Sequence, residues 1–355
     1  MTGKAKELLP MDRKFLFDIG HPAHVHLFRN FISYLEEENV PFVVTSRKKD
    51  LTTLLLDHYE IEHEVVSKQA FSWTGQLIEF FLRTARICLL HRKHRFTHAI
   101  GTSVSIGYLS LLTAGKVASF NFCEDDDDVI PLQALLSYPF STCIVNPQGI
   151  RHRRWAAKRL LLPTFHELAY LHPNRFKADP RVLAKYGLKN GDFIIMRLSS
   201  LKAHHDRNEQ GISPDLVLAI RDIAGLIPVI ESRELGNGQT IDPWDMHHLL
   251  AFSRLLVSDS QTMTIEAAIL GTPSIRISSF KNRLSCLDEV EANLEYVRSY
   301  FPSQIEEILE AVKESLKTNL SAAETQKSRM RFLESKLDYT DWMIQRLVLE
   351  RQIDD

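Results

Sequence analysis

The sequence predicts an α/β protein built from two tandem doubly wound, Rossmann-like domains followed by a helical tail. The chain has 355 residues, of which 44% are hydrophobic, and strand-like and helix-like segments alternate along it in two separate blocks. A chain of this length exceeds what one compact core usually holds, so we expect two domains. Strands that alternate with helices indicate parallel sheets covered by helices on both faces.

The first domain is expected at residues 11–165, after an extension at residues 1–10 that ends just before the first strand. Short apolar runs predict its buried strands. They are KFLFDI, PFVVTS, EHEVV, THAIGT, KVASFNF and STCIVN. Apolar residues at helical spacing predict helices between these strands, the longest from Phe71 to about His94.

A segment rich in Pro, Gly and polar residues, at 166–190, lacks an extended apolar run and predicts a linker. The alternation resumes in a second domain at 191–302, with strands at FIIMRLSS, LIPVIES, RLLVSD and PSIRIS. Residues 303–355 carry only helical patterns. We expect this tail to pack back on the first domain.

Composition excludes several classes of protein. The net charge of −2 gives no case for a nucleic-acid binder. The four cysteines form no C-x-x-C pair, which favours reduced thiols in a cytoplasmic protein over disulfides or a zinc site. The first ten residues lack an apolar signal-peptide core, and the longest apolar stretches fall short of the roughly 18 residues that a membrane span needs.

The stretch SDSQTMTIEAAILGTPSIR, from Ser258 to Arg276, places small hydroxyl residues between a buried strand and a short helix. The first N–H groups of a helix lack an acceptor within the helix, and the helix dipole is positive there, so phosphate binds favourably. Ser, Thr and Asp are also ordinary N-cap residues, which leaves a structural role open. Neither this stretch nor DIGHPAH is a G-x-G-x-x-G motif, which disfavours a nicotinamide dehydrogenase.

Four segments carry a family resemblance: DIGHPAHVHLFRNF, HELAYLHPNRF, MRLSS with the HHD that follows it, and SDSQTMTIEAAILGTPSIR. Through them most of the chain resembles an uncharacterised prokaryotic family, domain of unknown function 354. The last segment also resembles the donor-nucleotide segment of glycosyltransferase-B-fold enzymes, such as the UDP-N-acetylglucosamine 2-epimerases. The resemblance implies that fold and a nucleotide-sugar substrate, with uridine as the base.

The resemblance also implies roles for residues of the last segment. Ser260 and the backbone N–H groups of Gln261 and Thr262 would hold the diphosphate, and Glu266 would accept hydrogen bonds from the ribose hydroxyls. Glu266 could instead be a solvated carboxylate or one that compensates the helix dipole. The pair Gln261 and Thr262 replaces the Gly-Gly of the epimerases, so side chains narrow the approach of phosphate to the backbone.

Further cations are expected over the diphosphate. The segment 197–207 follows the first strand of the second domain and would overhang the donor site. Three of its residues could neutralise the departing diphosphate, a task that a metal performs in other transferases, or could be solvated loop residues: Lys202, His205 and Arg207. No metal cofactor is therefore expected.

The loop GHPAHVH supplies candidate bases in the first domain. His21 or His24 could deprotonate an acceptor hydroxyl, because histidine titrates near neutral pH. A metal site that also uses the HHD segment at 204–206 is a rival interpretation, disfavoured because two doubly wound domains do not form a barrel. The histidines could also only cap and pack.

Five acids follow the strand KVASFNF. By resemblance to the epimerases, Glu124 or Asp125 could be a catalytic acid or base. The run of four aspartates from Asp125 is otherwise predicted to be a solvated loop, since adjacent like charges repel. Thr102 and Ser103 stand where the epimerases have an aspartate, so their two-carboxylate proton relay is incomplete and sugar transfer or hydrolysis is favoured over epimerisation.

Two segments, 83–95 and 151–159, are rich in Arg and Lys and contain no acid. Together with Trp73, Phe80 and Phe81, they could rest on an anionic membrane, where lipid-linked acceptors lie. The alternative is a solvated helix face.

The sequence thus leads to three hypotheses of function. The first is a cytoplasmic glycosyltransferase-like enzyme that uses a nucleotide-sugar donor and a carbohydrate or lipid-linked acceptor in surface polysaccharide or glycolipid synthesis, peripheral to the inner face of the membrane. The second is a nucleotide-sugar 2-epimerase or hydrolase, which would turn over the donor without an acceptor. The third is a nucleotide-sugar-binding protein with a degenerate site.

Overall fold

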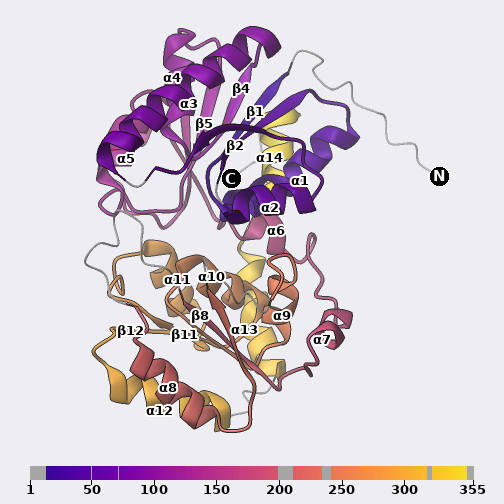
Figure 1. Cartoon of the computed structure of the whole chain (residues 1–355), viewed down its shortest axis with the longest axis vertical. Helices are drawn as coiled ribbons and strands as arrows, with labels where there is room; N and C mark the ends of the chain where they lie inside the picture. The colour runs from indigo at the N-terminus through magenta and orange to yellow at the C-terminus, as the bar shows by residue number, and fades with distance from the viewer. Residues whose placement is uncertain are drawn as a thin grey trace, which may run out of the picture.

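The chain forms two α/β domains, each built on a parallel sheet. The computed structural model describes residues 13–48, 50–70, 72–198, 211–233, 241–317 and 322–349. One sheet has seven strands and the other has five, and the two domains are stacked one above the other in Figure 1. This architecture confirms the predicted fold class.

The N-terminal sheet has the order β3-β2-β1-β4-β5-β6-β7, with every pairing parallel. An interior strand, β1, is buried along its whole length, as the apolar run KFLFDI requires. The strands are β1 (Phe15–Ile19), β2 (Phe42–Lys48), β3 (Glu64–Lys68), β4 (His98–Gly101), β5 (Ala118–Phe122), β6 (Cys143–Pro147) and β7 (Arg159–Leu162).

Helices cover both faces of this sheet. His21 is the N-cap of the first helix and Pro22 occupies its first turn, where a missing N–H costs nothing. Ser72 caps the long third helix by accepting from the N–H of Gly75 at 3.1 Å. The helices are α1 (Pro22–Glu37), α2 (Asp50–His58), α3 (Trp73–His94), α4 (Val104–Leu112) and α5 (Pro131–Ser137).

The C-terminal sheet has the order β12-β11-β10-β8-β9 and is also parallel. Its strands are β8 (Ile194–Leu198), β9 (Val229–Arg233), β10 (Leu255–Ser258), β11 (Ser274–Ile277) and β12 (Val297–Tyr300). Its helices are α8 (Pro214–Ala224), α9 (Met246–Phe252), α10 (Gln261–Leu270) and α11 (Ser285–Asn293). Strands β7 and β12, each of four residues at a sheet edge, were not predicted from the sequence.

The segment between the domains contains a short turn of 3-10 helix (Ala156–Lys158), α6 (Leu168–Leu171) and α7 (Arg181–Lys185). All four residues of α6 are buried, and α6 contacts α1, α10 and α14. The apolar side chains of α6 belong to one hydrophobic cluster that includes residues of both domains. The predicted linker is therefore partly a packed element that joins the domains, and its four apolar residues were too few to show a period.

The C-terminal tail crosses from one domain to the other. Helix α12 (Ile305–Lys317) packs on α8 of the second domain, and α13 (Ala322–Glu334) contacts α10. Helix α14 (Tyr339–Met343), which continues as a π-helical turn (Ile344–Val348), contacts α1 and α6 and lies next to α1 within the upper domain in Figure 1. The expected packing on the first domain therefore applies to the end of the tail, whereas α12 belongs to the second domain.

Within the described part of the chain, no helix combines the length and the apolar character needed to cross a membrane.

Candidate functional site

The strand order of each sheet reverses at one point, and the predicted loops lie at these points. In the N-terminal sheet the reversal falls between β1 and β4, and in the C-terminal sheet between β8 and β10. Ligands of open parallel sheets bind outside the carboxyl ends of the strands at such a switch point. The segments there are residues 20–24 after β1, which include the first turn of α1, and the loop residues 102–103 after β4 and 259–260 after β10.

His21 and His24 lie together at the N-terminus of α1, with ring centroids 5.7 Å apart. The Nδ1 atom of His21 accepts from the N–H of Ala23 at 3.3 Å, so this ring caps the helix. The Nδ1 atom of His24 lies 3.2 Å from Oγ1 of Thr102. Both side chains are half-buried. The structure thus brings the loops after β1 and β4 together, with His24 held by a hydroxyl of the neighbouring loop.

Beneath this loop lies an ion pair that the sequence did not reveal. Asp18, at the end of β1, is fully buried and accepts from Nε of Arg83 at 3.0 Å, from Thr45 at 2.7 Å and from Ser103. Burial alone would raise the pKa of Asp18, but the Arg83 guanidinium and the two hydroxyls hold it below its ordinary value. The ion pair thereby fixes the carboxyl ends of β1 and β4 relative to α3.

Helix α10 begins at the predicted phosphate site. Ser260 is its N-cap, with Oγ accepting from the N–H of Met263 at 3.4 Å, and the Ser258 hydroxyl accepts from the N–H of Ser260 at 2.9 Å. Among the described residues, none accepts from the N–H groups of Gln261 or Thr262, which precede the first intrahelical acceptor. Ser260 therefore performs the capping role, and two N–H groups remain for a ligand. Gly271 ends the helix in the left-handed conformation, with φ of 84°.

Glu266, in the second turn of α10, is buried and connects the second domain to α6. Its Oε1 atom accepts from the hydroxyl of Tyr170 in α6 at 2.8 Å and from Nε2 of His247 in α9 at 2.9 Å. Burial and the neighbouring Glu266 raise the pKa of Tyr170 well above its ordinary value, so the phenol remains a donor. The alternative interpretation of Glu266 as a solvated carboxylate is wrong, because only 4% of the residue is exposed.

Glu124 forms a carboxylate pair with Glu167 at the domain junction. Oε1 of Glu124 accepts from the backbone N–H of His166 at 2.7 Å, and the two carboxyl groups are near enough for each to affect the pKa of the other. Burial raises the pKa of Glu124 to about 8, and burial together with Glu124 raises that of Glu167 well above its ordinary value. Two adjacent carboxylates cannot both ionise easily, so the pair holds a proton at neutral pH.

The three carboxylates of the junction come from three parts of the chain. Glu124 follows β5 of the first domain, Glu167 precedes α6, and Glu266 lies in α10 of the second domain. The charges of both Glu124 and Glu266 contribute to the raised pKa of Glu167. His166 stays neutral beside them, because burial and the nearby His24 lower its pKa to about 3. Side chains that can donate or accept protons are thus gathered at the domain junction.

The aspartate run is not the solvated loop that its charge predicts. Asp126 is fully buried and accepts from the N–H and Oγ of Ser285 in α11, at 2.8 and 2.6 Å, and from Arg151. Asp127 is buried as well and pairs with Arg159 at 2.5 Å. Asp125 is half-buried and Asp128 is exposed. Asp126 therefore connects the domains, and each buried charge is offset by donors distant in sequence.

Other predicted residues lie outside the described residues. These are Lys202, His205 and Arg207, and also the HHD segment at 204–206 of the rival metal interpretation. Among the residues that the structure does describe, no group of three or more His, Cys, Asp or Glu side chains could hold a metal ion.

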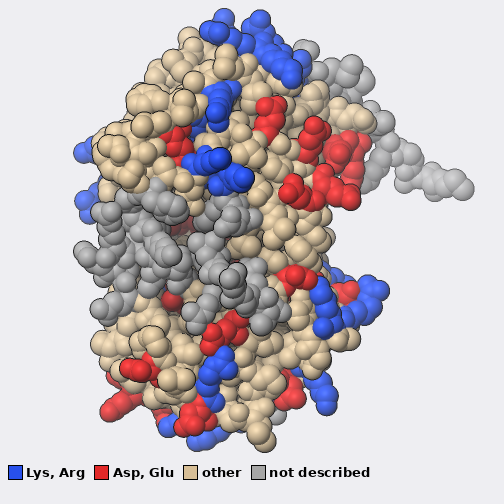
Figure 2. All heavy atoms as spheres, viewed as in Figure 1, with Lys and Arg blue, Asp and Glu red and all other residues tan. Residues whose placement is uncertain are grey.

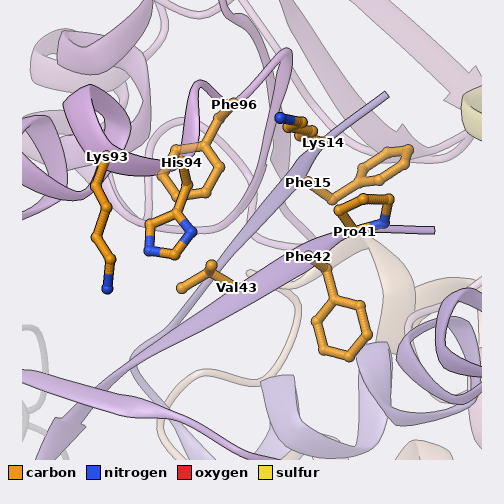
Figure 3. A pocket seen from close by; sticks show the side chains of 8 residues that line it. All are labelled: Lys14, Phe15, Pro41, Phe42, Val43, Lys93, His94 and Phe96. Atoms are coloured by element: carbon orange, nitrogen blue, oxygen red, sulfur yellow. The ribbon is translucent and has the colours of Figure 1, made fainter. Parts of the chain in front are cut away.

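Two cavities lie at different distances from the candidate site. One, of about 230 Å³, is lined by Phe15, Phe42 and His94 among others (Figure 3). It lies at the amino ends of β1 and β2, the sheet edge opposite the candidate site, so we assign it no ligand. The other, of about 430 Å³, is lined by residues of both domains and reaches His247, so it borders the Glu266 cluster.

Sequence reasoning missed Glu167, Tyr170 and His247. The segment HELAYL placed an acid and a tyrosine among apolar residues at the domain boundary. That pattern is the available signal, because a polar group buried in an apolar segment needs a partner. His247 gave no such signal, since a histidine pair in a short helix is compatible with an exposed position.

Solved structures with the same fold include UDP-N-acetylglucosamine 2-epimerases and a forosaminyltransferase. A putative UDP-N-acetylglucosamine 2-epimerase from Listeria monocytogenes is 11% identical with a TM-score of 0.67, over 97% of this chain and 99% of that one. The UDP-GlcNAc 2-epimerase from Neisseria meningitidis, bound to UDP-GlcNAc, is 11% identical with a TM-score of 0.65, over 95% and 100%. The spinosyn forosaminyltransferase SpnP is 10% identical with a TM-score of 0.62, over 94% and 98%.

These similarities show a glycosyltransferase-B-like fold, as the family resemblance implied. No curated protein matches the sequence. The family model described as "Protein of unknown function (DUF354)" matches residues 13–350, which is nearly the whole described chain. The chain therefore belongs to the DUF354 family.

Proposed function

We propose that the chain is a glycosyltransferase-like enzyme that moves a sugar from a nucleotide diphosphate, with UDP as the carrier, to a carbohydrate or lipid-linked acceptor. The observation that carries the proposal is the convergence of Glu124, Glu167 and Glu266, the last of which lies in the second turn of α10. In this proposal, acid–base groups of the first domain and of the segment between the domains act next to a helix of the second domain whose N-terminus binds the diphosphate. The solved structures of the same fold that are described as an epimerase and a forosaminyltransferase add support.

In this proposal the second domain holds the donor. The N–H groups of Gln261 and Thr262 and the Thr262 hydroxyl bind the diphosphate, as a helix N-terminus favours. A carboxylate has about four lone-pair sites. Glu266 uses two of them for Tyr170 and His247 and keeps capacity for ribose hydroxyls. Lys202, His205 and Arg207 add positive charge over the diphosphate, so that no metal is required.

The first domain supplies the proton transfers. His24 or His21 takes the proton from the acceptor hydroxyl as its oxygen bonds to the anomeric carbon. The bond from that carbon to the diphosphate breaks, and Glu124, which is protonated at neutral pH, donates a proton to the leaving oxygen. Asp125 lies next to this acid and is the second candidate for its role. The enzyme would act at the cytoplasmic face of a membrane, in surface polysaccharide or glycolipid synthesis.

One observation favours epimerisation as a second candidate function. The sequence lacks an aspartate at Thr102 and Ser103, but Glu167 provides a second carboxyl group near Glu124, and each affects the pKa of the other. Two carboxyl groups that share a proton can remove a proton from a sugar carbon and return it. Incubation of the chain with UDP-sugar in D₂O, without acceptor, separates the functions: deuterium at C2 indicates epimerisation, and UDP release indicates hydrolysis. Donor that remains intact until an acceptor is added indicates transfer.

Calorimetry tests the donor site. We expect wild-type chain to bind UDP and Glu266→Ala to bind it roughly tenfold or more weakly, because a hydrogen bond to a charged group contributes about 1.5–3 kcal/mol. Glu306→Ala, which removes an exposed acid of α12, is the matched control and should bind as the wild type does. Absence of binding by the wild type to any nucleotide diphosphate would refute the proposal. Equal binding by Glu266→Ala would remove Glu266 from the site, and binding without turnover would favour a degenerate site.

A further inference from the structure

The outward face of α3 is apolar. Its exposed side chains are Trp73, Leu77, Ile78, Phe81, Leu82 and Leu89, with exposed fractions between 42% and 65%. These positions recur at helical spacing and form one stripe along the helix. A helix on the surface of a globular domain ordinarily turns its polar side to water. The stripe on α3 is therefore unusual for a surface that faces only solvent.

The inward face of the same helix carries the buried charges. Arg83 is 2% exposed and binds Asp18, while Glu79 is 7% exposed and accepts from Ser67 at 2.9 Å and from Arg47 at 2.7 Å. Rotating the helix to hide its apolar stripe would break these bonds. The orientation of α3 is thus imposed by the ion pairs, and the exposed apolar stripe follows from it.

The stripe continues onto the next two helices. On α4, Leu111 and Leu112 are 50% and 64% exposed, and on α5, Leu132 and Leu135 are 47% and 51% exposed. Helix α4 contacts both α3 and α5. Figure 2 shows the surface over these helices, at the upper left, as largely uncharged, with Lys and Arg at its edges and one small acidic patch beside it. We call this surface the α3–α5 face. Contiguous apolar surfaces of this kind mark an interaction site.

The exposed charges on α3, α4 and the segments next to them have one sign. Between residues 72 and 123 the sequence holds a single acid, Glu79, which is buried. The exposed charged side chains of the same span are all cations: Arg86, Arg92, Lys93, Arg95 and Lys116. An apolar stripe bordered by cations has the composition of an interfacial amphipathic helix. The surface therefore complements an apolar layer with negative charge at its boundary.

We propose that the α3–α5 face binds the surface of a membrane that contains anionic lipids. The apolar side chains would enter the boundary between headgroups and acyl chains, and the cations would lie among the headgroups. A second copy of the chain is a poorer occupant, because a two-fold contact sets the same cations against each other. This proposal does not depend on which reaction the candidate site catalyses.

Co-sedimentation of the full chain with lipid vesicles tests the charge component. We expect binding to vesicles of phosphatidylcholine mixed with phosphatidylglycerol, weaker binding to phosphatidylcholine alone, and a decrease as salt is raised. Arg92→Gln combined with Lys93→Gln should reduce the preference for anionic vesicles by about fivefold for each charge removed. Failure of the wild type to bind anionic vesicles would overturn the proposal.

A second pair of changes tests the apolar component. Ile78→Ser with Phe81→Ser should weaken vesicle binding by about tenfold or more, because each buried side chain contributes transfer free energy. The matched control is Leu218→Ser on α8, which removes a leucine that is 65% exposed in the other domain and should not alter binding. Circular dichroism verifies that each variant is folded. If the variant with Ile78→Ser and Phe81→Ser binds vesicles as strongly as the wild type does, the proposal is contradicted. It is also contradicted if the wild type forms a dimer that binds no vesicles and if the two substitutions dissociate this dimer.

Discussion

Replacing Glu124 with glutamine is expected to lower turnover by about 10²- to 10⁴-fold, the usual contribution of a general acid or base. The amide oxygen can still accept from the N–H of His166, so the local structure is retained, but the side chain can no longer donate its acidic proton. UDP affinity measured by calorimetry should stay close to that of the wild type, because the glutamine amide can still donate a hydrogen bond to the diphosphate oxygen although it cannot transfer a proton. Steady-state kinetics with UDP-sugar and acceptor measures the loss.

The pH profile shows whether Glu124 acts as an acid or as a base. Because burial raises its pKa to about 8, Glu124 is protonated below that pH and ionised above it. If it donates a proton, turnover falls as the pH rises through about 8, and if it accepts one, turnover rises there. Asp128→Asn, which changes an exposed acid of the same segment, should leave the profile unchanged. A Glu124→Gln variant with wild-type turnover would exclude Glu124 from catalysis.

The fold followed from periodicity because most strands are short apolar runs and most helices are amphipathic. Strands β7 (Arg159–Leu162) and β12 (Val297–Tyr300) escaped the prediction because each has four residues and lies at a sheet edge. An edge strand needs no apolar run on both faces, so its sequence resembles that of a loop. The carboxyl ends of the strands at the candidate site were predicted, because polar loops directly follow buried strands in the sequence.

It was harder to predict from the sequence which residues form the candidate site than to predict where in the fold the site lies. Glu167 and Tyr170 come from a segment interpreted as a linker, and their role depends on contacts with Glu124 and Glu266, which are distant in the chain. Asp126 was interpreted as solvated because neighbouring aspartates repel, yet Ser285 and Arg151 supply enough donors to bury it. Long-range pairing of this kind leaves no local period in the sequence.

The cations of α3 illustrate the same limit. The sequence shows that residues 83–95 contain Arg and Lys without an acid, which suggests one basic face. The structure divides them, since Arg83 points inward to Asp18 and Arg92 is exposed. Helical spacing places these two residues differently around the helix, but the sequence could not identify the buried carboxylate that Arg83 meets.

Replacing Arg83 with methionine is expected to lower the free energy of unfolding by about 3–5 kcal/mol, because Asp18 would remain buried without its cation. Methionine fills much of the space of the arginine, so the loss reports the charge rather than a cavity. Denaturant unfolding followed by tryptophan fluorescence measures the change. Arg92→Met, an exposed site on the same helix, is the control and should alter stability by no more than about 0.5 kcal/mol.

The pH dependence of this loss identifies its cause. In the wild type, Arg83 holds the pKa of Asp18 below 3.8, so the stability that this carboxylate contributes is present above that pH and is lost as the pH falls through its folded-state pKa. Without Arg83, burial raises the pKa of Asp18, so the variant should gain stability as the pH falls toward 3.8. The difference from the wild type then narrows in acid, and Arg83→Met combined with Asp18→Asn should recover part of the loss at neutral pH. A difference that stays constant with pH would mean that Arg83 stabilises α3 by packing and not by its charge.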